Sequence, residues 1–213
     1  GKSTFVKILS GVYTPTEGKI CLDEKKVNIT SPIVAQKNGV SLIHQEPQSF
    51  SHLSVAENIF MGHMEGNNFS RVKWQDINNK SNEILESIGL KIDPKIIMEG
   101  LSIADQQMIE IAGALSKNSK VLIMDEPTSP LTPNEVGKLF DIVNKLKSNG
   151  IAIIFISHRL EEIRQISDRV TIFRDGDLIT TKNINEVSNE EIIKFMICLL
   201  YTSPSPREAT LSR

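Results

Sequence analysis

The chain of 213 residues carries 24 basic and 26 acidic residues, a formal net charge of -2, and 39% of it is hydrophobic. This composition suits one buried core, or one domain with an inserted lobe, and gives no reason to expect nucleic acid or an acidic membrane surface as a partner. Its two cysteines, Cys21 and Cys198, match no metal-binding spacing and predict no disulfide framework, so a reducing compartment is expected. No apolar run reaches the ~20 residues that a bilayer span requires, and no signal peptide is recognisable.

The first predicted element is the end of a phosphate-binding loop that leads into a helix. The chain opens on Gly1, Lys2, Ser3 and Thr4, which match the end of the pattern G-x-x-x-x-G-K-[ST]. In such loops the lysine reaches the β- and γ-phosphates and the hydroxyl binds Mg²⁺, roles that fall here on Lys2 and Ser3. A helix from Phe5 onward would direct free N–H groups toward the anion. Alone, this short match is not specific.

A strand is predicted next, over the apolar residues 40–44, and Gln45 follows it directly. Ahead of that strand, Ser31 before Pro32 predicts the N-terminus of a helix, because serine caps helices and proline suits their first turn. Gln45 is therefore expected at the carboxyl end of a strand.

The middle of the sequence, from Leu53 to Leu115, has the apolar spacing of helices. One helix is expected to be capped by Ser70 and to end at Gly89. A second would carry apolar residues on one face from Met108 onward.

An apolar run over residues 121–124 ends in two adjacent acids, Asp125 and Glu126. Such a run predicts a strand buried on both faces of a parallel sheet, whose carboxyl end is where these sheets bind ligands. There Asp125 would hold Mg²⁺ through water, and Glu126 would polarise the water that attacks the terminal phosphate. The alternative, open from this segment alone, is a buried strand followed by a solvated acidic turn.

Helices and strands alternate again after these acids. Thr132 and Glu135 form a capping-box pattern that predicts a helix ending near Gly150. Residues 151–156 predict another buried strand, which leads to His158.

The final predicted elements are a hairpin and a helix. Asp175 and Gly176 separate two apolar segments within residues 169–181, which is typical of a hairpin turn. Ser188 is expected to cap a helix that runs to Met196. The whole pattern predicts an α/β fold with a mostly parallel sheet and an inserted helical part.

The ordered motifs resemble the ATP-binding cassette (ABC) family. The set comprises Gly1-Lys2-Ser3-Thr4, Gln45, Leu101-Ser102, Asp125-Glu126 and His158. Together, in this order and in these strand and helix contexts, they are far more specific than any one of them. Three further segments, residues 11–15, 53–62 and 106–112, are similar to the first cassette of bacterial monosaccharide importers of the ribose, galactose and xylose type, which fuse two cassettes in one polypeptide.

The resemblance covers about residues 1–196 and implies a P-loop NTPase with a RecA-like core. It places an inserted helical subdomain at about residues 50–115. The N-terminal strand and the glycine-rich front of the phosphate loop are expected to be missing, so that this fragment alone is expected to bind ATP poorly or not at all and to be inactive by itself. Residues 197–213 are expected to be a translated sequencing-adapter read, the alternative being a disordered Ser/Pro linker.

The resemblance also implies roles for single residues. Gln45 matches the glutamine that touches Mg²⁺ and senses the membrane subunits, and His158 matches the histidine that hydrogen-bonds the γ-phosphate and holds the attacking water. Ser102 matches the signature serine, which donates to the γ-phosphate bound by the opposite cassette. Ala104 and Asp105 replace the usual glycine and glutamine of that signature, a departure that bears on the strength of this contact.

The implied catalytic residues are Glu126 and His158, the ATP contacts are Gly1, Lys2, Ser3, Thr4, Gln45, Ser102 and Ala104, and the Mg²⁺ ligands are Ser3, Gln45 and Asp125.

The function that the resemblance implies is ATP hydrolysis that powers monosaccharide import, with ATP and Mg²⁺ as cofactors. The expected partners are a second cassette, fused or dimeric, transmembrane permease subunits and, indirectly, an extracytoplasmic sugar-binding protein, but no nucleic acid. The expected location is peripheral, on the cytoplasmic face of the cell membrane. The alternatives are a non-transport ABC ATPase acting on ribosomes or DNA, which would be expected to show basic patches, and a regulatory nucleotide-binding half.

Two segments keep alternative interpretations. Phe50, Leu53, Phe60 and Met61 would pack on a permease helix or, equally, belong to the core of the helical part. Residues 129–132 resemble the loop that links paired cassette sites, or serve only as the N-terminus of the next helix.

Overall fold

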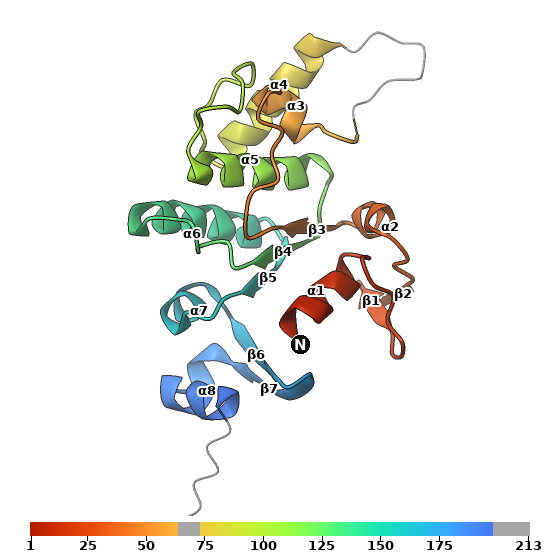
Figure 1. Ribbon diagram of the computed structural model, residues 1–213, viewed down its shortest axis with the longest axis vertical. Helices are drawn as coiled ribbons and strands as arrows, with labels where there is room; N and C mark the ends of the chain where they lie inside the picture. The colour runs from red at the N-terminus through yellow and green to blue at the C-terminus, as the bar shows by residue number, and fades with distance from the viewer. Residues whose placement is uncertain (64–72, 198–213) are drawn as a thin grey trace, which may run out of the picture. The chain divides into compact units, whose positions relative to one another are not determined.

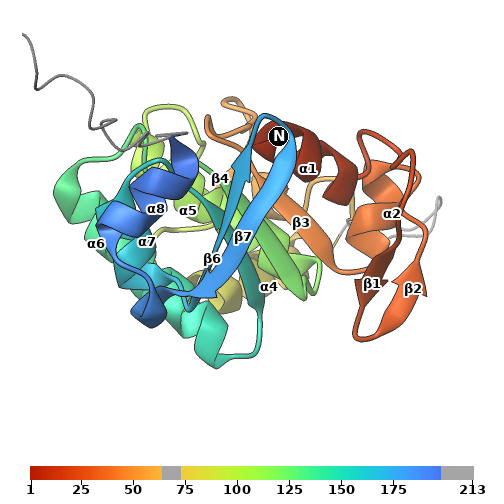
Figure 2. The ribbon, with the colours of Figure 1, turned by 90° about the horizontal axis from the view of Figure 1, so that it is seen from below.

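The computed structural model describes residues 1–63 and 73–197. They divide into two compact units, a larger one over Lys2–Ser167 and a smaller one formed by Gly1 and the chain from Asp168 onward (Figures 1 and 2). The predicted helix cap at Ser70 and the predicted tail, apart from Ile197, lie outside the described residues. Within the described ranges, no helix combines the length and apolar character that crossing a bilayer demands.

A three-stranded parallel sheet, in the order β3-β4-β5, forms the centre of the larger unit. The strands are β3 (Val40–Ile43), β4 (Val121–Asp125) and β5 (Ala152–Ile156). In register, Val121 of the central strand lies opposite Val40 on one side and Ala152 on the other. The three predicted strands and their parallel arrangement are therefore confirmed.

Helices surround this sheet in the larger unit. They are α1 (Lys2–Leu9), α2 (Pro32–Lys37), α3 (Val55–Ile59), α4 (Trp74–Ser87), α5 (Ile103–Ser116), α6 (Pro133–Ser148) and α7 (Leu160–Ile166). The helices predicted from Phe5, Pro32, Met108 and Thr132 are all present. The helix expected to end at Gly89 is α4, and Gly89 follows it with a φ of 81°.

Two hydrophobic cores lie against the two faces of β4. Leu122 and Met124 belong to a core shared with α3, α4, α5 and α6, whereas Ile123 packs with Val6 of α1 and Ala35 of α2. Figure 1 shows α1 and α5 on opposite sides of the sheet. Burial on both faces is the reason why this strand has no polar alternation in its sequence.

The capping box at Thr132 is confirmed. The Glu135 carboxylate accepts hydrogen bonds from the backbone N–H of Thr132 at 2.8 Å and from its hydroxyl at 2.7 Å. These bonds hold the pKa of Glu135 below its ordinary value. The segment after the acids of β4 is thereby fixed at the start of α6.

The smaller unit contains the predicted hairpin and helix. Its antiparallel strands are β6 (Arg169–Arg174) and β7 (Asp177–Asn183), followed by a short 3-10 helix (Ile184–Glu186) and by α8 (Asn189–Met196). Asp175 and Gly176 have φ angles of 53° and 99°, as a tight hairpin turn requires. Ser188 caps α8 by accepting from the N–H of Glu191 at 3.1 Å.

One hairpin was not predicted from the sequence. Its strands are β1 (Ile20–Leu22) and β2 (Lys25–Val27). They are joined by Asp23 and Glu24, both at positive φ. An Asp-Glu turn lacks the glycine or asparagine that usually marks such a conformation, and three-residue strands show no clear periodicity.

Gly11 provides a test of the packing between α1 and α2. It has a φ of 78°, and an added Cβ would lie 2.4 Å from the carbonyl of Ser31, the residue that caps α2. Gly18 has a φ of 90° but open space around it. Gly18→Ala should cost about 1–2 kcal/mol from backbone strain alone, and Gly11→Ala about 1–3 kcal/mol more from the clash. Urea unfolding of both variants measures the difference, and equal losses would contradict the tight contact.

Candidate functional site

The carboxyl ends of the three parallel strands carry the residues expected to act on a nucleotide. Gln45 follows β3, Asp125 ends β4 with Glu126 next to it, and His158 follows β5. Because parallel strands end at the same edge of their sheet, these residues emerge on one side. The β4 and β5 ends are in register, with Asp125 opposite Ile156.

The side chains of Glu126 and His158 lie close together at this edge. Nδ1 of His158 lies 3.2 Å from Oε1 of Glu126, and the two side chains are 60% and 27% exposed, respectively. The backbone N–H of Glu126 also donates to the carbonyl of Ile156 at 3.0 Å. Glu126 has a φ of 49°, a conformation that non-glycine residues seldom adopt outside functional sites and turns. An acid is therefore held beside a histidine in a restrained geometry.

Asp125 lies partly buried in the same site. Burial raises its pKa, and the negative charge of Glu126 raises it further, while the positive charges of Lys2 and His44 oppose this shift. The lysine at the start of α1 thus acts electrostatically on the acid at the end of β4. Two adjacent acids, incompletely neutralised by the protein, are suited to a bound cation.

The residues expected to bind Mg²⁺ have suitable chemistry. Ser3, Gln45 and Asp125 offer a hydroxyl, an amide and a carboxylate, all oxygen donors. Among residues 1–63 and 73–197, no cluster of three or more His, Cys, Asp or Glu side chains is placed to hold a metal. Mg²⁺ usually binds to one or two protein carboxylates together with substrate phosphates and water, so its ligands need not all come from the protein. One carboxylate with neutral oxygen donors is consistent with such binding. The donor set therefore fits Mg²⁺.

The remaining predicted site residues lie on other elements. Thr4 is exposed on α1, next to Ser3, whereas Gly1 belongs to the smaller unit. Ser102 is the N-cap of α5, and its hydroxyl accepts from the N–H of Asp105 at 3.1 Å and donates to the Asp105 carboxylate at 2.8 Å. Ala104 is buried, so its predicted contact with ATP stays a prediction.

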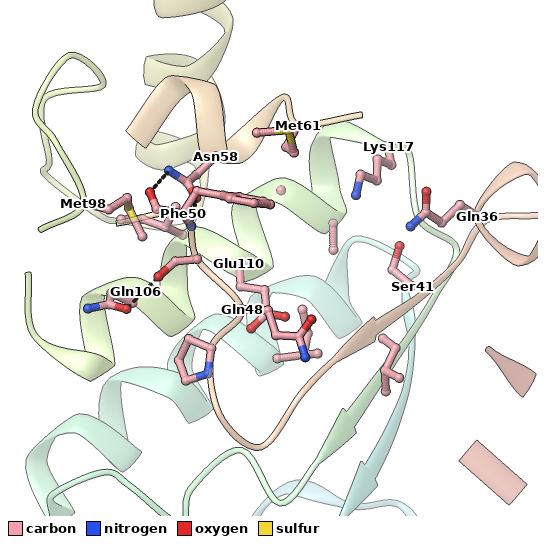
Figure 3. Close-up of a pocket in the computed structure, with 17 residues that line it drawn as sticks. Gln36, Ser41, Gln48, Phe50, Asn58, Met61, Met98, Gln106, Glu110 and Lys117 are labelled. Carbon is pink, nitrogen blue, oxygen red and sulfur yellow. Dashed lines mark hydrogen bonds between the residues drawn. The ribbon is translucent and has the colours of Figure 1, made fainter. Parts of the chain in front are cut away.

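A pocket of about 180 Å³ opens beside the segment that follows β3 (Figure 3). Ser49 from this segment donates to the side chain of Gln106 on α5 at 2.8 Å, and the N–H of Phe50 donates to Asn58 at 2.8 Å. Phe50 and Met61 line the pocket, whereas Phe60 is part of the buried core. Phe60 therefore belongs to the core, whereas contact of Phe50 or Met61 with a permease helix stays a prediction.

Glu110 of α5 also lines this pocket, and the sequence did not single it out. Its carboxylate is largely buried, and burial raises its pKa to about 7, against the backbone N–H of His44 and the charge of Lys117. Its Oε2 has no hydrogen-bond partner within the described part of the chain. The signal in the sequence that could have identified Glu110 is an acidic residue among the apolar residues of α5.

A sequence profile of the family described as ABC transporter matches residues 1–129. Among solved structures, cbiO1 from Clostridium perfringens, part of the ABC transporter complex cbiONQ, has a TM-score of 0.75 at 28% identity, covering 91% of this chain and 77% of that one. The ADP conformation of MJ1267, an ATP-binding cassette of an ABC transporter, has a TM-score of 0.76 at 25% identity, covering 91% of this chain and 78% of that one.

Two curated relatives are named as import ATP-binding proteins. The ribose import ATP-binding protein RbsA of Clostridium tetani is 46% identical over 92% of this chain and 39% of its own length. The galactose/methyl galactoside import ATP-binding protein MglA of Fusobacterium nucleatum subsp. nucleatum is 44% identical over 98% of this chain and 41% of its own length. The chain spans about two fifths of the length of these relatives.

The fold is that of a P-loop NTPase, with the architecture of the ATP-binding cassettes. The chain belongs to the ABC transporter family, since the family profile covers more than half of it. The predicted fold class and family resemblance are confirmed. The boundaries of the helical subdomain and the roles of single residues stay predictions.

The partly buried residue Glu110 should make stability depend on pH. Its folded pKa of about 7 exceeds the ordinary 4.5, so the folded chain keeps a proton that the unfolded chain releases. Its contribution to the free energy of unfolding therefore falls as pH rises from about 4.5 to about 7.

Glu110→Gln removes this titration. The stability of the variant relative to the parent should increase by an amount on the order of 3 kcal/mol between pH 5 and pH 8. Denaturant unfolding at several pH values measures this, with the exposed Glu83→Gln as control. A constant difference between the Glu110 variant and the parent would show that Glu110 does not titrate as described.

Proposed function

We propose that this chain is the ATP-binding and ATP-hydrolysing part of an ABC transporter that imports a monosaccharide. The observation that carries the proposal is the 3.2 Å pair of Glu126 and His158 beside Asp125, at the ends of adjacent parallel strands. Relatives named for ribose and galactose import, at 46% and 44% identity, support the transport role and the sugar class.

The proposed site residues have different roles in binding the phosphates and Mg²⁺. Lys2 would bind the β- and γ-phosphates, aided by the free N–H groups at the start of α1. Ser3, Gln45 and Asp125 would hold Mg²⁺, which would neutralise charge on the phosphates. Both roles use side chains that are exposed or half-buried.

Glu126 would orient the attacking water and accept hydrogen bonding from it, because its carboxylate stands next to the acid assigned to the metal. His158 would hold that carboxylate through the observed pair and contact the γ-phosphate with its other ring nitrogen. Glu126 has a positive φ, which strains the backbone of a non-glycine residue. Such strain is typical of residues whose side-chain direction is needed for function.

A second cassette would complete each site. Ser102 is exposed at the N-terminus of α5, where a helix favours an anion. Its hydroxyl proton is directed to Asp105, so donation to a phosphate requires rotation of that hydroxyl. The replacement of the usual glycine and glutamine by Ala104 and Asp105 would affect the strength of this contact.

The membrane subunits would contact the pocket beside the segment that follows β3. Phe50 is exposed at its rim, and Ser49 connects the pocket to α5 through Gln106, close to the signature residues. The protein would thus lie on the cytoplasmic face of the cell membrane and respond indirectly to an extracytoplasmic sugar-binding protein. The net charge of -2 does not favour nucleic acid as a partner.

Replacing Glu126 by glutamine in the full-length protein tests the proposal. ATP turnover should fall at least about a hundredfold, because a group that assists proton transfer is lost, while ATP affinity is retained. Steady-state phosphate release and equilibrium nucleotide binding measure the two quantities. Glu161→Gln, on an exposed neighbour of the site, is the control. Unchanged turnover would remove Glu126 from its role and favour a regulatory nucleotide-binding function.

A further inference from the structure

Glu162 is a buried acid on α7 whose carboxylate accepts three hydrogen bonds. Its Oε2 accepts from the hydroxyl of Thr128 at 2.8 Å and from the hydroxyl of Ser157 at 2.7 Å. Its Oε1 accepts from Nη1 of Arg159 at 3.2 Å. Glu162 and Thr128 are 7% and 2% exposed, so that two of these groups are shielded from water.

These bonds join the two segments that carry the proposed catalytic pair. Thr128 follows Glu126 on the segment after β4, and Ser157 immediately precedes His158 after β5. The Ser157 hydroxyl also accepts from the backbone N–H of Arg159 at 3.0 Å, which fixes the turn around the histidine. One carboxylate oxygen therefore bridges the segments that follow β4 and β5 at the same edge of the sheet.

The cost of this arrangement indicates a specific role. A buried carboxylate is unfavourable unless its oxygens are hydrogen-bonded and its charge is compensated. A simple apolar residue at this position of α7 would have avoided that cost, whereas Glu162 satisfies two hydroxyls and pairs with Arg159. In addition, Glu126 has a positive φ of 49°, which persists only where neighbouring contacts restrain it.

We propose that Glu162 is a positioning residue for ATP hydrolysis, which fixes the distance and direction of Glu126 relative to His158 by clamping Thr128 to Ser157. This inference rests on the proposed function. Glu162 is assigned no contact with the nucleotide: the residues assigned to the phosphates, Lys2 and Ser3, lie on α1, whereas the clamp joins α7 to the segments after β4 and β5.

The test compares kcat and KM for ATP in the full-length protein. Glu162→Gln should lower kcat ten- to a hundredfold, because small displacements of a catalytic group have effects of this size, with KM within about threefold of the parent. Thr128→Val, which removes one donor of the clamp, should lower kcat in the same way. Glu161→Gln, on the exposed side of α7, should leave both constants unchanged. Thermal unfolding and nucleotide affinity confirm that the variants are folded.

A double variant separates positioning from a general structural role. In a Glu126→Gln background, adding Glu162→Gln should have no further effect on residual turnover, since the residue that it positions is already inactive. A further tenfold loss there, a rise in KM alone, or a parent-like kcat in the folded single variant would overturn the inference. If Glu126→Gln itself keeps full turnover, the proposed function fails rather than the positioning role.

Discussion

The burial of β4 between two parallel neighbours is the constraint on which the site depends. Its apolar residues enter cores on both faces of the sheet, and its pairing with β3 and β5 fixes its position along the strand direction. Asp125 and Glu126 must therefore emerge at the carboxyl edge, where burial and mutual repulsion raise the pKa of Asp125. The same packing that stabilises the sheet places two acids where a phosphate and a cation can reach them.

Side-chain and backbone hydrogen bonds then convert this edge into a defined geometry. The N–H of Glu126 bonds to the carbonyl of Ile156, and Glu162 connects the segments beyond the two strands. In the proposed arrangement these bonds hold Glu126 close to His158, whose Nδ1 lies 3.2 Å from Oε1 of Glu126. A preorganised site of this kind lowers the reorganisation needed when substrate binds.

Much of the fold could be predicted because its signals are local. The strands around β4, the capping boxes at Thr132 and Ser188 and the turn at Gly176 each follow from a short pattern with one physical cause. The order of Gln45, Ser102, Asp125 and His158 gave the family. By contrast, Glu162 has no local signal of its role, and Glu110 is marked only as an acid among the apolar residues of α5, because their environments arise from burial and from partners far along the chain.

In the proposed function, the Glu126–His158 pair drives ATP hydrolysis that is coupled to sugar import. The most direct measurement is ATP-dependent uptake of labelled ribose and galactose by vesicles that hold the full-length protein with its membrane subunits and a sugar-binding protein. Uptake should require ATP and should stop in His158→Ala, although the variant still binds ATP. Parent-like uptake by His158→Ala, or no ATP-dependent uptake of any monosaccharide by the parent, would contradict the account.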